Sequence, residues 1–388
     1  MKYVDKLLYI IILLLVFLKC FAISKYSIQT FSAYGIIILS LGGILFNYKA
    51  LVNKIILLLT FYFLSLLFSI TYIFDYLAVS DFLNSLLFPL IFIISYIYFK
   101  KYPKDIKWFK YIGVVAIILA YYNLLRLSLE INLRSTHLLQ SNAGNTLVAL
   151  IPFATLWKNK IIRYGLFILI FLGCLVAIKR SAFVIFIAVM FAYLLLMSKE
   201  NLYKSIFKYV FLLSFVGVIV LPEIKSAAPL LERMSNSVDD GGSGRDELVK
   251  RGIMFLSENN FSDWVIGNGY LGFRQASKLI NRNNTCAHND FVEILYDAGF
   301  ISYIFFLWIL GALFIYGYKL YKSRTEYATD VTSMNHLNIF ISFICCTIIF
   351  FCANIFVCTF VHFWYYLPMY CLWGAVYSIS NNYRYENL

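Results

Sequence analysis

The stretch Ala287-His288-Asn289-Asp290-Phe291-Val292-Glu293-Ile294-Leu295 leads past Gly299 into an apolar run. This stretch ends the only long polar segment of the chain, Glu223 to Asp297. A histidine, an asparagine and two acids are costly so close to a membrane helix unless they have a role. We therefore expect the chemistry of the chain to lie in this segment, with the remainder as its scaffold.

The composition excludes a soluble globular chain. Of 388 residues, 62% are hydrophobic, 19% are aromatic and only 14% are charged, and the mean hydropathy is +0.78. A membrane-spanning helix needs roughly 20 apolar residues, and such runs recur almost without a break. The sequence predicts an all-α, polytopic membrane protein with about twelve spans and one long, partly helical outer loop.

The predicted organisation has three parts. Residues 1–222 hold the first nine spans, residues 223–297 form the outer loop with the polar motifs, and residues 298–388 hold the last three spans and a C-terminal tail. The shortest span, Asn145–Trp157, contains Pro152. The predicted spans are Leu7–Ile23, Ile28–Phe46, Ile55–Phe74, Phe82–Phe99, Phe109–Leu127, Asn145–Trp157, Ile161–Ile178, Ser181–Met197, Ser205–Leu221, Phe300–Tyr318, Leu337–Cys358 and Phe360–Ile379.

The net charge of +13 has a membrane explanation. With the N-terminus inside, more than half of the 33 lysines and arginines fall in inner segments, as the positive-inside rule predicts. We therefore expect both termini to be cytoplasmic, the long loop to be external, and no nucleic acid to be bound. Of the eight cysteines, only Cys286 lies in the loop, without a partner there, so neither a disulfide nor a zinc site is expected.

Lys179-Arg180 lies between two spans on the outer side, where basic residues are disfavoured. Basic residues at this position suggest that they bind an anion. The alternative is a pair whose long side chains extend to the membrane interface, which would give the same sequence pattern. In the loop, Ser243 and Asp246 have capping-box spacing and predict a helix from Arg245 to Glu258. Arg245 would then project from the first turn, where free N–H groups also favour a phosphate.

The next motif is Trp264-Val265-Ile266-Gly267-Asn268-Gly269-Tyr270-Leu271-Gly272-Phe273-Arg274. It lacks the context of a nucleotide-binding loop. Its glycines would let the backbone approach a ligand while Trp264, Tyr270 or Phe273 stacks on sugar rings; a tightly turned surface loop is an equally good interpretation.

His288 is the most informative single residue. Asp290 and Glu293 have capping-box spacing, so a helix should start at Asp290 and run toward Gly299. The positive end of that helix would favour a neutral imidazole at His288. A neutral histidine that faces an outer cavity fits a general base, whereas a histidine satisfied by local hydrogen bonds is the alternative.

These motifs together resemble the O-antigen polymerase and ligase family. The likeness rests on Lys179-Arg180-Ser181-Ala182 at the start of a span, Ser243-Gly244-Arg245, Gly267-Asn268-Gly269, and Ala287-His288-Asn289-Asp290-Phe291 with Glu293 and Gly299. It covers about Asn145 to Tyr318, and the chain departs from the commoner Ser-Arg-Gly pattern at residues 179–181.

The resemblance implies a GT-C-like glycosyltransferase of the bacterial inner membrane that needs neither metal ion nor nucleotide. Its donor would be a glycan on undecaprenyl diphosphate at the periplasmic face, and a polysaccharide chain-length regulator would be its protein partner. By the same resemblance, Arg180 and Arg245 would grip the diphosphate and His288 would deprotonate or orient the acceptor hydroxyl. Arg274, Asn289 and Asp290 would contribute to substrate binding. Arginines can replace a metal ion here because diphosphate is already a good leaving group.

The resemblance leaves two acceptors open. A polymerase extends another lipid-linked repeat unit, whereas a ligase transfers the glycan to lipid A core; residues 287–297 look more like the polymerase version. A lipid-linked sugar transporter is the rival class, but the predicted spans contain no Asp or Glu, which coupled carriers usually keep within the bilayer. For either enzyme, Arg180, Arg245 and His288 should converge with side-chain ends on the order of 10 Å apart.

Overall fold

The computed structural model describes residues 2–21, 26–69, 82–130, 137–198, 241–281, 286–327, 333–357 and 363–386, with the single residues 204, 206, 208 and 210. Throughout these ranges the regular secondary structure is helical. Contacts divide the chain into two units that interleave along the sequence. The first comprises Met1–Pro103, Asp240–Tyr316 and Phe351–Ser378, and the second comprises Lys104–Asp239, Gly317–Phe350 and Ile379–Leu388.

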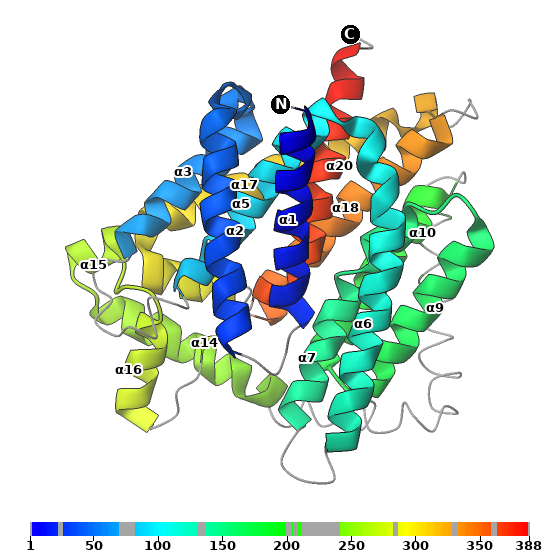
Figure 1. Cartoon of the computed structure of the whole chain (residues 1–388). Coiled ribbons are helices and arrows are strands. Elements are labelled where there is room, and N and C mark those ends of the chain that lie inside the picture. The colour runs from blue at the N-terminus through cyan, green and yellow to red at the C-terminus, as the bar shows by residue number, and fades with distance from the viewer. Residues whose placement is uncertain are drawn as a thin grey trace. The chain divides into compact units, whose positions relative to one another are not determined.

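In the first unit, α1 and α2 pack against each other and both contact α5 (Figure 1). The apolar residues of α5 are almost all buried, so this helix is the core of the unit. The helices of the first unit are α1 (Lys2–Phe21), α2 (Tyr26–Phe46), η1 (Tyr48–Val52), α3 (Lys54–Phe68), α5 (Leu87–Lys101), α14 (Gly241–Glu258), α15 (Phe261–Ile266), α16 (Gly272–Asn281), most of α17 (Asp290–Tyr327), η6 (Phe363–Tyr366) and most of α20 (Leu367–Glu386).

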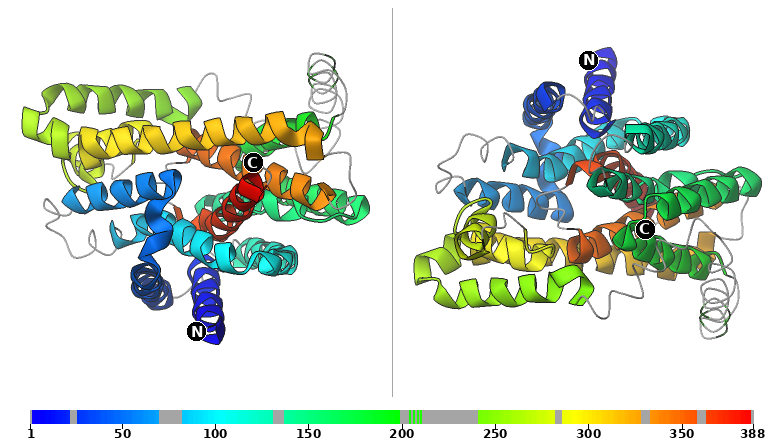
Figure 2. Two further views of the ribbon diagram at one scale, coloured as in Figure 1. Left: turned by 90° about the horizontal axis from the view of Figure 1, so that it is seen from above. Right: turned by 90° about the horizontal axis from the view of Figure 1, so that it is seen from below.

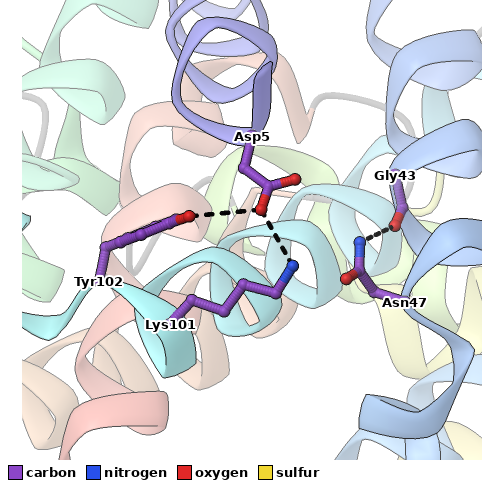
Figure 3. Close-up of polar contacts among 5 residues, drawn as sticks. All are labelled: Asp5, Gly43, Asn47, Lys101 and Tyr102. Carbon is purple, nitrogen blue, oxygen red and sulfur yellow. Dashed lines mark hydrogen bonds and ion pairs between the residues drawn. The ribbon is translucent and has the colours of Figure 1, made fainter. Parts of the chain in front are cut away.

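A polar cluster joins the ends of α1 and α5 (Figure 3). Asp5 Oδ2 accepts from Lys101 Nζ at 3.0 Å and from the hydroxyl of Tyr102 at 3.4 Å. Nearby, Asn47 Nδ2 donates to the carbonyl of Gly43 at 2.8 Å. Because both charges are partly exposed, the ion pair contributes about 1 kcal/mol or less.

In the second unit, α7 packs against α6, α9 and α10. Arg163 of α9 is buried, and its Nη1 donates to Asn338 Oδ1 of α18 at 3.3 Å. Its guanidinium also lies over the ring of Tyr193 in α10, 5.7 Å from the centroid. The helices of the second unit are η3 (Pro103–Lys107), α6 (Trp108–Glu130), α7 (His137–Val148), α8 (Ile151–Thr155), α9 (Lys160–Val176), α10 (Arg180–Met197), the end of α17, most of α18 (Ser333–Phe356) and the end of α20.

The predicted fold class is confirmed: the protein is an all-α, polytopic membrane protein. Six helices among the described residues are long and apolar enough to cross a membrane. Each predicted span largely coincides with helix over its described residues, except Asn145–Trp157. Ser205–Leu221 falls almost entirely outside the described residues. The total of about twelve spans and the division at residues 222 and 297 stay predictions.

The exception breaks into two helices. α7 ends at Val148 and the five-residue α8 begins at Ile151 with a proline in its first turn. Pro152 has no N–H to continue the α7 ladder, and its ring clashes with the preceding turn of a helix. The helix predicted over Asn145–Trp157 is therefore interrupted at residues 149–150, and its role as a membrane span stays a prediction.

Candidate functional site

The helix that follows the polar segment starts where the sequence predicts. α17 begins at Asp290, and Asn289 caps it. Asn289 Oδ1 accepts the N–H of Phe291 at 3.0 Å, and its carbonyl accepts the N–H of Glu293 at 3.0 Å. The predicted capping box, with Asp290 as the cap, is wrong by one residue, because Asp290 already lies inside the helix and the preceding asparagine serves as the cap.

His288 lies two residues before the first residue of α17, and its backbone is in the left-handed conformation. It is half-buried and has φ 53°, in the left-handed region. The N–H of Ala287, which is fully buried, donates to Glu293 Oε2 at 2.7 Å. The sequence indicated no partner for Cys286, yet its sulfur lies 3.6 Å from His288 Nδ1. The imidazole is therefore carried by a backbone that side chains hold on both sides.

The first turns of α17 bury three acids on one face. Asp290, Glu293 and Asp297 are spaced three and four residues apart, and each is 0% exposed. This spacing places them one above another along the helix. From the sequence, Asp290 and Glu293 were predicted to cap the helix and Asp290 to contribute to substrate binding, whereas Asp297 had no predicted role. The i, i+3, i+7 pattern was the available signal.

Asp297 fixes the start of α16. Its two carboxylate oxygens accept the N–H groups of Leu271 at 2.9 Å and Phe273 at 2.8 Å. Complete burial raises the pKa of Asp297 to about 7, although both backbone N–H groups and the charge of Arg274 oppose the rise. The carboxyl precedes the kink at Gly299, after which the apolar run begins, so it lies outside the predicted span Phe300–Tyr318. Arg274 therefore directly follows a residue whose N–H is held by Asp297, and its charge acts on that carboxyl.

The backbones of two glycines, Gly267 and Gly299, are in close contact at this kink. Gly267 has φ 85° and Gly299 has φ 75°. A Cβ on Gly267 would lie 2.3 Å from the carbonyl oxygen of Asp297, and one on Gly299 would lie 2.5 Å from the nitrogen of Gly267. The N–H of Asn268 donates to the carbonyl of Tyr296 at 2.9 Å. The close backbone approach at Gly267 is to α17, and the predicted approach of this motif to a ligand stays a prediction.

The aromatic candidates differ in exposure. Trp264 in α15 is 37% exposed, whereas Tyr270 is 2% exposed and Phe273 is fully buried. The ring of Tyr270 meets Phe82 edge-on, with centroids 5.6 Å apart. Trp264 is therefore the aromatic of this motif that presents a ring at the surface.

A small core joins α14 to the start of α17. Phe255 and Leu256 of α14 pack with Phe273, Ala287 and Tyr296. α14 runs beside the first part of α17 in both views of Figure 2, and a Cβ on Gly252 would lie 2.3 Å from Val292 Cγ1.

Arg245 lies on α14, about two turns before Gly252. The predicted end of this helix at Glu258 is confirmed, but the helix starts at Gly241 and not at Arg245. Glycine costs about 1 kcal/mol in a helix but does not forbid it, so the helix extends past the predicted cap. Arg245 therefore belongs to the second turn, and its side chain lies outside the described residues.

Arg180 belongs to the second unit, where it is the first residue of α10. The predicted start of a helix here is confirmed. Ile178, two residues earlier, has φ 51°, and Lys179 makes no side-chain cap. Because Arg180 and His288 belong to different units, their convergence with Arg245 stays a prediction.

Among the described residues, no group of three or more His, Cys, Asp and Glu side chains is arranged to hold a metal ion.

Comparison with known proteins places these elements in context. Residues 165–307 match the family model described as O-Antigen ligase. This O-antigen ligase segment is the part of the chain that is similar to that family. The O-antigen ligase segment contains Arg180, Arg245, Arg274 and His288, the cationic and histidine candidates of the site. A search of curated proteins found no match. The resemblance predicted from the motifs is confirmed, and the match supports a membrane enzyme of surface-polysaccharide assembly.

Proposed function

We propose that the protein is a glycosyltransferase that polymerises O-antigen repeat units at the periplasmic face of the bacterial inner membrane. The donor is an oligosaccharide on undecaprenyl diphosphate, and the acceptor is a second lipid-linked repeat unit. The observation that carries the proposal is His288, half-buried on a left-handed backbone immediately before α17, inside the O-antigen ligase segment.

The reaction balances without an added reactant. The acceptor hydroxyl oxygen forms a bond to the anomeric carbon while the bond from that carbon to the diphosphate oxygen breaks. The hydroxyl proton passes to His288, and undecaprenyl diphosphate leaves with the bonding electrons. Attack from the face opposite the leaving group inverts the anomeric centre.

The cations take the leaving-group charge. Arg180 and Arg245 hold the diphosphate in this proposal, because planar guanidinium groups bind phosphate oxygens in a bidentate manner. Low dielectric near the bilayer strengthens both contacts. Arg274 and Asn289, which are both half-buried, contribute to substrate binding in this proposal, and Trp264 is the exposed ring available for a sugar. The roles of Tyr270 and Asp290 in substrate binding stay predictions; the structure buries both side chains.

Acceptor choice is the deciding experiment. Purified protein is incubated with lipid-linked repeat units, with and without lipid A core, and the products are separated by size. A polymerase produces ladders on undecaprenyl diphosphate without core. Transfer that requires core would make the protein a ligase, the activity named in the description of the matching family model. Transport of the lipid-linked units without any new glycosidic bond would overturn both.

A further inference from the structure

Glu293 is a buried acid with a specific partner in the backbone beside His288. Its carboxylate is 0% exposed, so it must be compensated by hydrogen bonds. Oε2 accepts the N–H of Ala287 at 2.7 Å, across six residues of sequence. A backbone N–H donates to a carboxyl oxygen here at the short end of the normal N–H···O range.

This bond lies on one side of His288, and the Asn289 cap lies on the other. Asn289 Oδ1 holds the N–H of Phe291, so the residue that follows His288 is fixed to the first turn of α17. Ala287, on the side that precedes it, is fully buried in the core of Phe255, Leu256, Phe273 and Tyr296. His288 is the single residue between these fixed points, and it adopts φ 53°.

A left-handed backbone at a histidine is uncommon and is kept only where neighbouring contacts determine it. With that backbone fixed, the side chain of His288 leaves the chain in one direction, and its imidazole contacts the Cys286 sulfur. Loss of the Glu293 bond would free the N–H of Ala287 and with it the direction of the imidazole.

We infer that Glu293 is a positioning residue for transfer: it holds the Ala287 N–H and thereby aims the His288 imidazole at the acceptor hydroxyl. The inference rests on the proposed function, in which His288 takes the proton. Glu293 itself contacts no substrate in this scheme. A misplacement of about 1 Å at a reacting group can lower a rate by about 100-fold, so orientation alone gives a measurable effect.

Three variants separate the possibilities. Glu293→Gln keeps a side-chain oxygen that can accept the Ala287 N–H and should retain transfer within about threefold. Glu293→Leu removes the acceptor, and Glu293→Asp withdraws it by one methylene; both should lower kcat by about 100-fold. KM for the lipid-linked donor should change by less than about threefold, because the diphosphate is held by the arginines. Glu247→Leu, the same replacement at an exposed acid of α14, should behave like the unaltered protein.

A double-mutant cycle tests whether Glu293 acts through His288. The His288→Ala, Glu293→Leu and combined variants are compared in the same transfer assay, with thermal unfolding midpoints recorded for each. If Glu293 only positions His288, the combined variant should be as slow as His288→Ala alone. Additive losses, full activity of Glu293→Leu, or an inactive Glu293→Gln that still folds would overturn the inference.

The two proposals fail differently in this experiment. Full transfer by His288→Ala would overturn the proposed function, and with it any role of Glu293 through that imidazole. An inactive His288→Ala beside a fully active Glu293→Asp would leave the proposed function in place and remove Glu293 alone. If Glu293→Leu does not fold, the Gln and Asp variants carry the same comparison.

Discussion

Two helices of the O-antigen ligase segment start in the same way but are held by different forces. α10 begins at Arg180 and α17 begins at Asp290, and in each case a residue other than glycine adopts a left-handed conformation two positions earlier. Ile178 has φ 51° and His288 has φ 53°. The backbone reversal is shared, although isoleucine is a poor residue for that conformation and histidine is a tolerated one.

The supports differ. At α17, side-chain oxygens of Asn289 and Glu293 accept backbone N–H groups on both sides of His288. At α10, Lys179 provides no side-chain cap, and the turn instead packs closely on Gly144 of α7, where a Cβ would lie 3.2 Å from the Cβ atoms of Ala177, Lys179 and Ala182. The hydrogen bonds around His288 fix the direction of its side chain. At α10, close packing instead fixes the position of the start of the helix. The difference suits a proton acceptor at α17 and an anion-holding cation at α10.

The largest expected effect is at His288. His288→Ala and His288→Asn should each lower glycan transfer by about 1,000-fold, the usual range for loss of a general base. Asparagine tolerates the left-handed backbone, so an equal loss in both variants isolates the imidazole from the turn. Size-resolved glycan products from membranes with matched protein levels measure the effect. Normal polymer ladders from either variant would contradict the role of the His288 imidazole as proton acceptor. The proposed difference in function between the starts of α10 and α17 would then be wrong.

The next effect is on stability and depends on pH. Asp297 has a folded-state pKa of about 7 and an ordinary value of 3.8, so the folded state binds the proton more tightly. Its contribution is complete below pH about 4 and is lost as the pH rises through 7, by about 4 kcal/mol in all. The thermal unfolding midpoint in detergent should therefore fall from pH 5 to pH 8.

Asp297→Asn provides the control for this titration. The carboxamide keeps one acceptor oxygen for the α16 start but cannot lose a proton, so the drop in midpoint between pH 5 and pH 8 should shrink. An unchanged pH profile in the variant would assign the titration to another group. The start of α10 rests on close packing against Gly144, so Gly144→Ala should leave the pH profile as it is.

The arginines come third. Arg180→Lys and Arg245→Lys keep the charge but lose bidentate binding of phosphate, which should weaken transfer by about 30-fold, or about 2 kcal/mol. Arg251→Lys is the matched control, because it lies on α14 and pairs with Glu247. Steady-state transfer with varied lipid-linked donor measures the change. A normal rate for Arg245→Lys beside a slow Arg180→Lys would confine the diphosphate grip to α10.

Much of this architecture follows from local sequence patterns. Apolar runs predicted most helices, and the polar residues 287–293 predicted the start of α17 at Asp290. The order and spacing of the short motifs along the sequence also indicated the family. Each of these signals is short-range and is visible within a few turns of chain.

The contacts that complete the site are long-range, and the sequence could not reveal them. Asp297 accepts N–H groups from residues 24 and 26 positions away; its i, i+3, i+7 spacing with Asp290 and Glu293 indicates a shared helix face but not these partners. The sequence predicted Asp290 as the cap and the structure has Asn289. Both residue types are good caps, so local sequence could not choose between them. Likewise, the glycine motif at residue 267 was compatible with a ligand loop until Gly299 was found against it.

The smallest expected effect comes from a variant that disturbs the packing of Gly144 against the start of α10. Gly144→Ala places a methyl group 3.2 Å from three Cβ atoms, so the helix start must shift by a few tenths of an ångström at a cost of about 1 kcal/mol. KM for the lipid-linked donor should rise a few-fold with little change in kcat, because Arg180 moves and His288 does not. Gly165→Ala in α9 meets nothing within 4 Å and should instead stabilise the helix slightly. If Gly144→Ala lowered kcat and left KM unchanged, packing at α10 would act on the chemical step, and the division of roles between the two helix starts would be wrong.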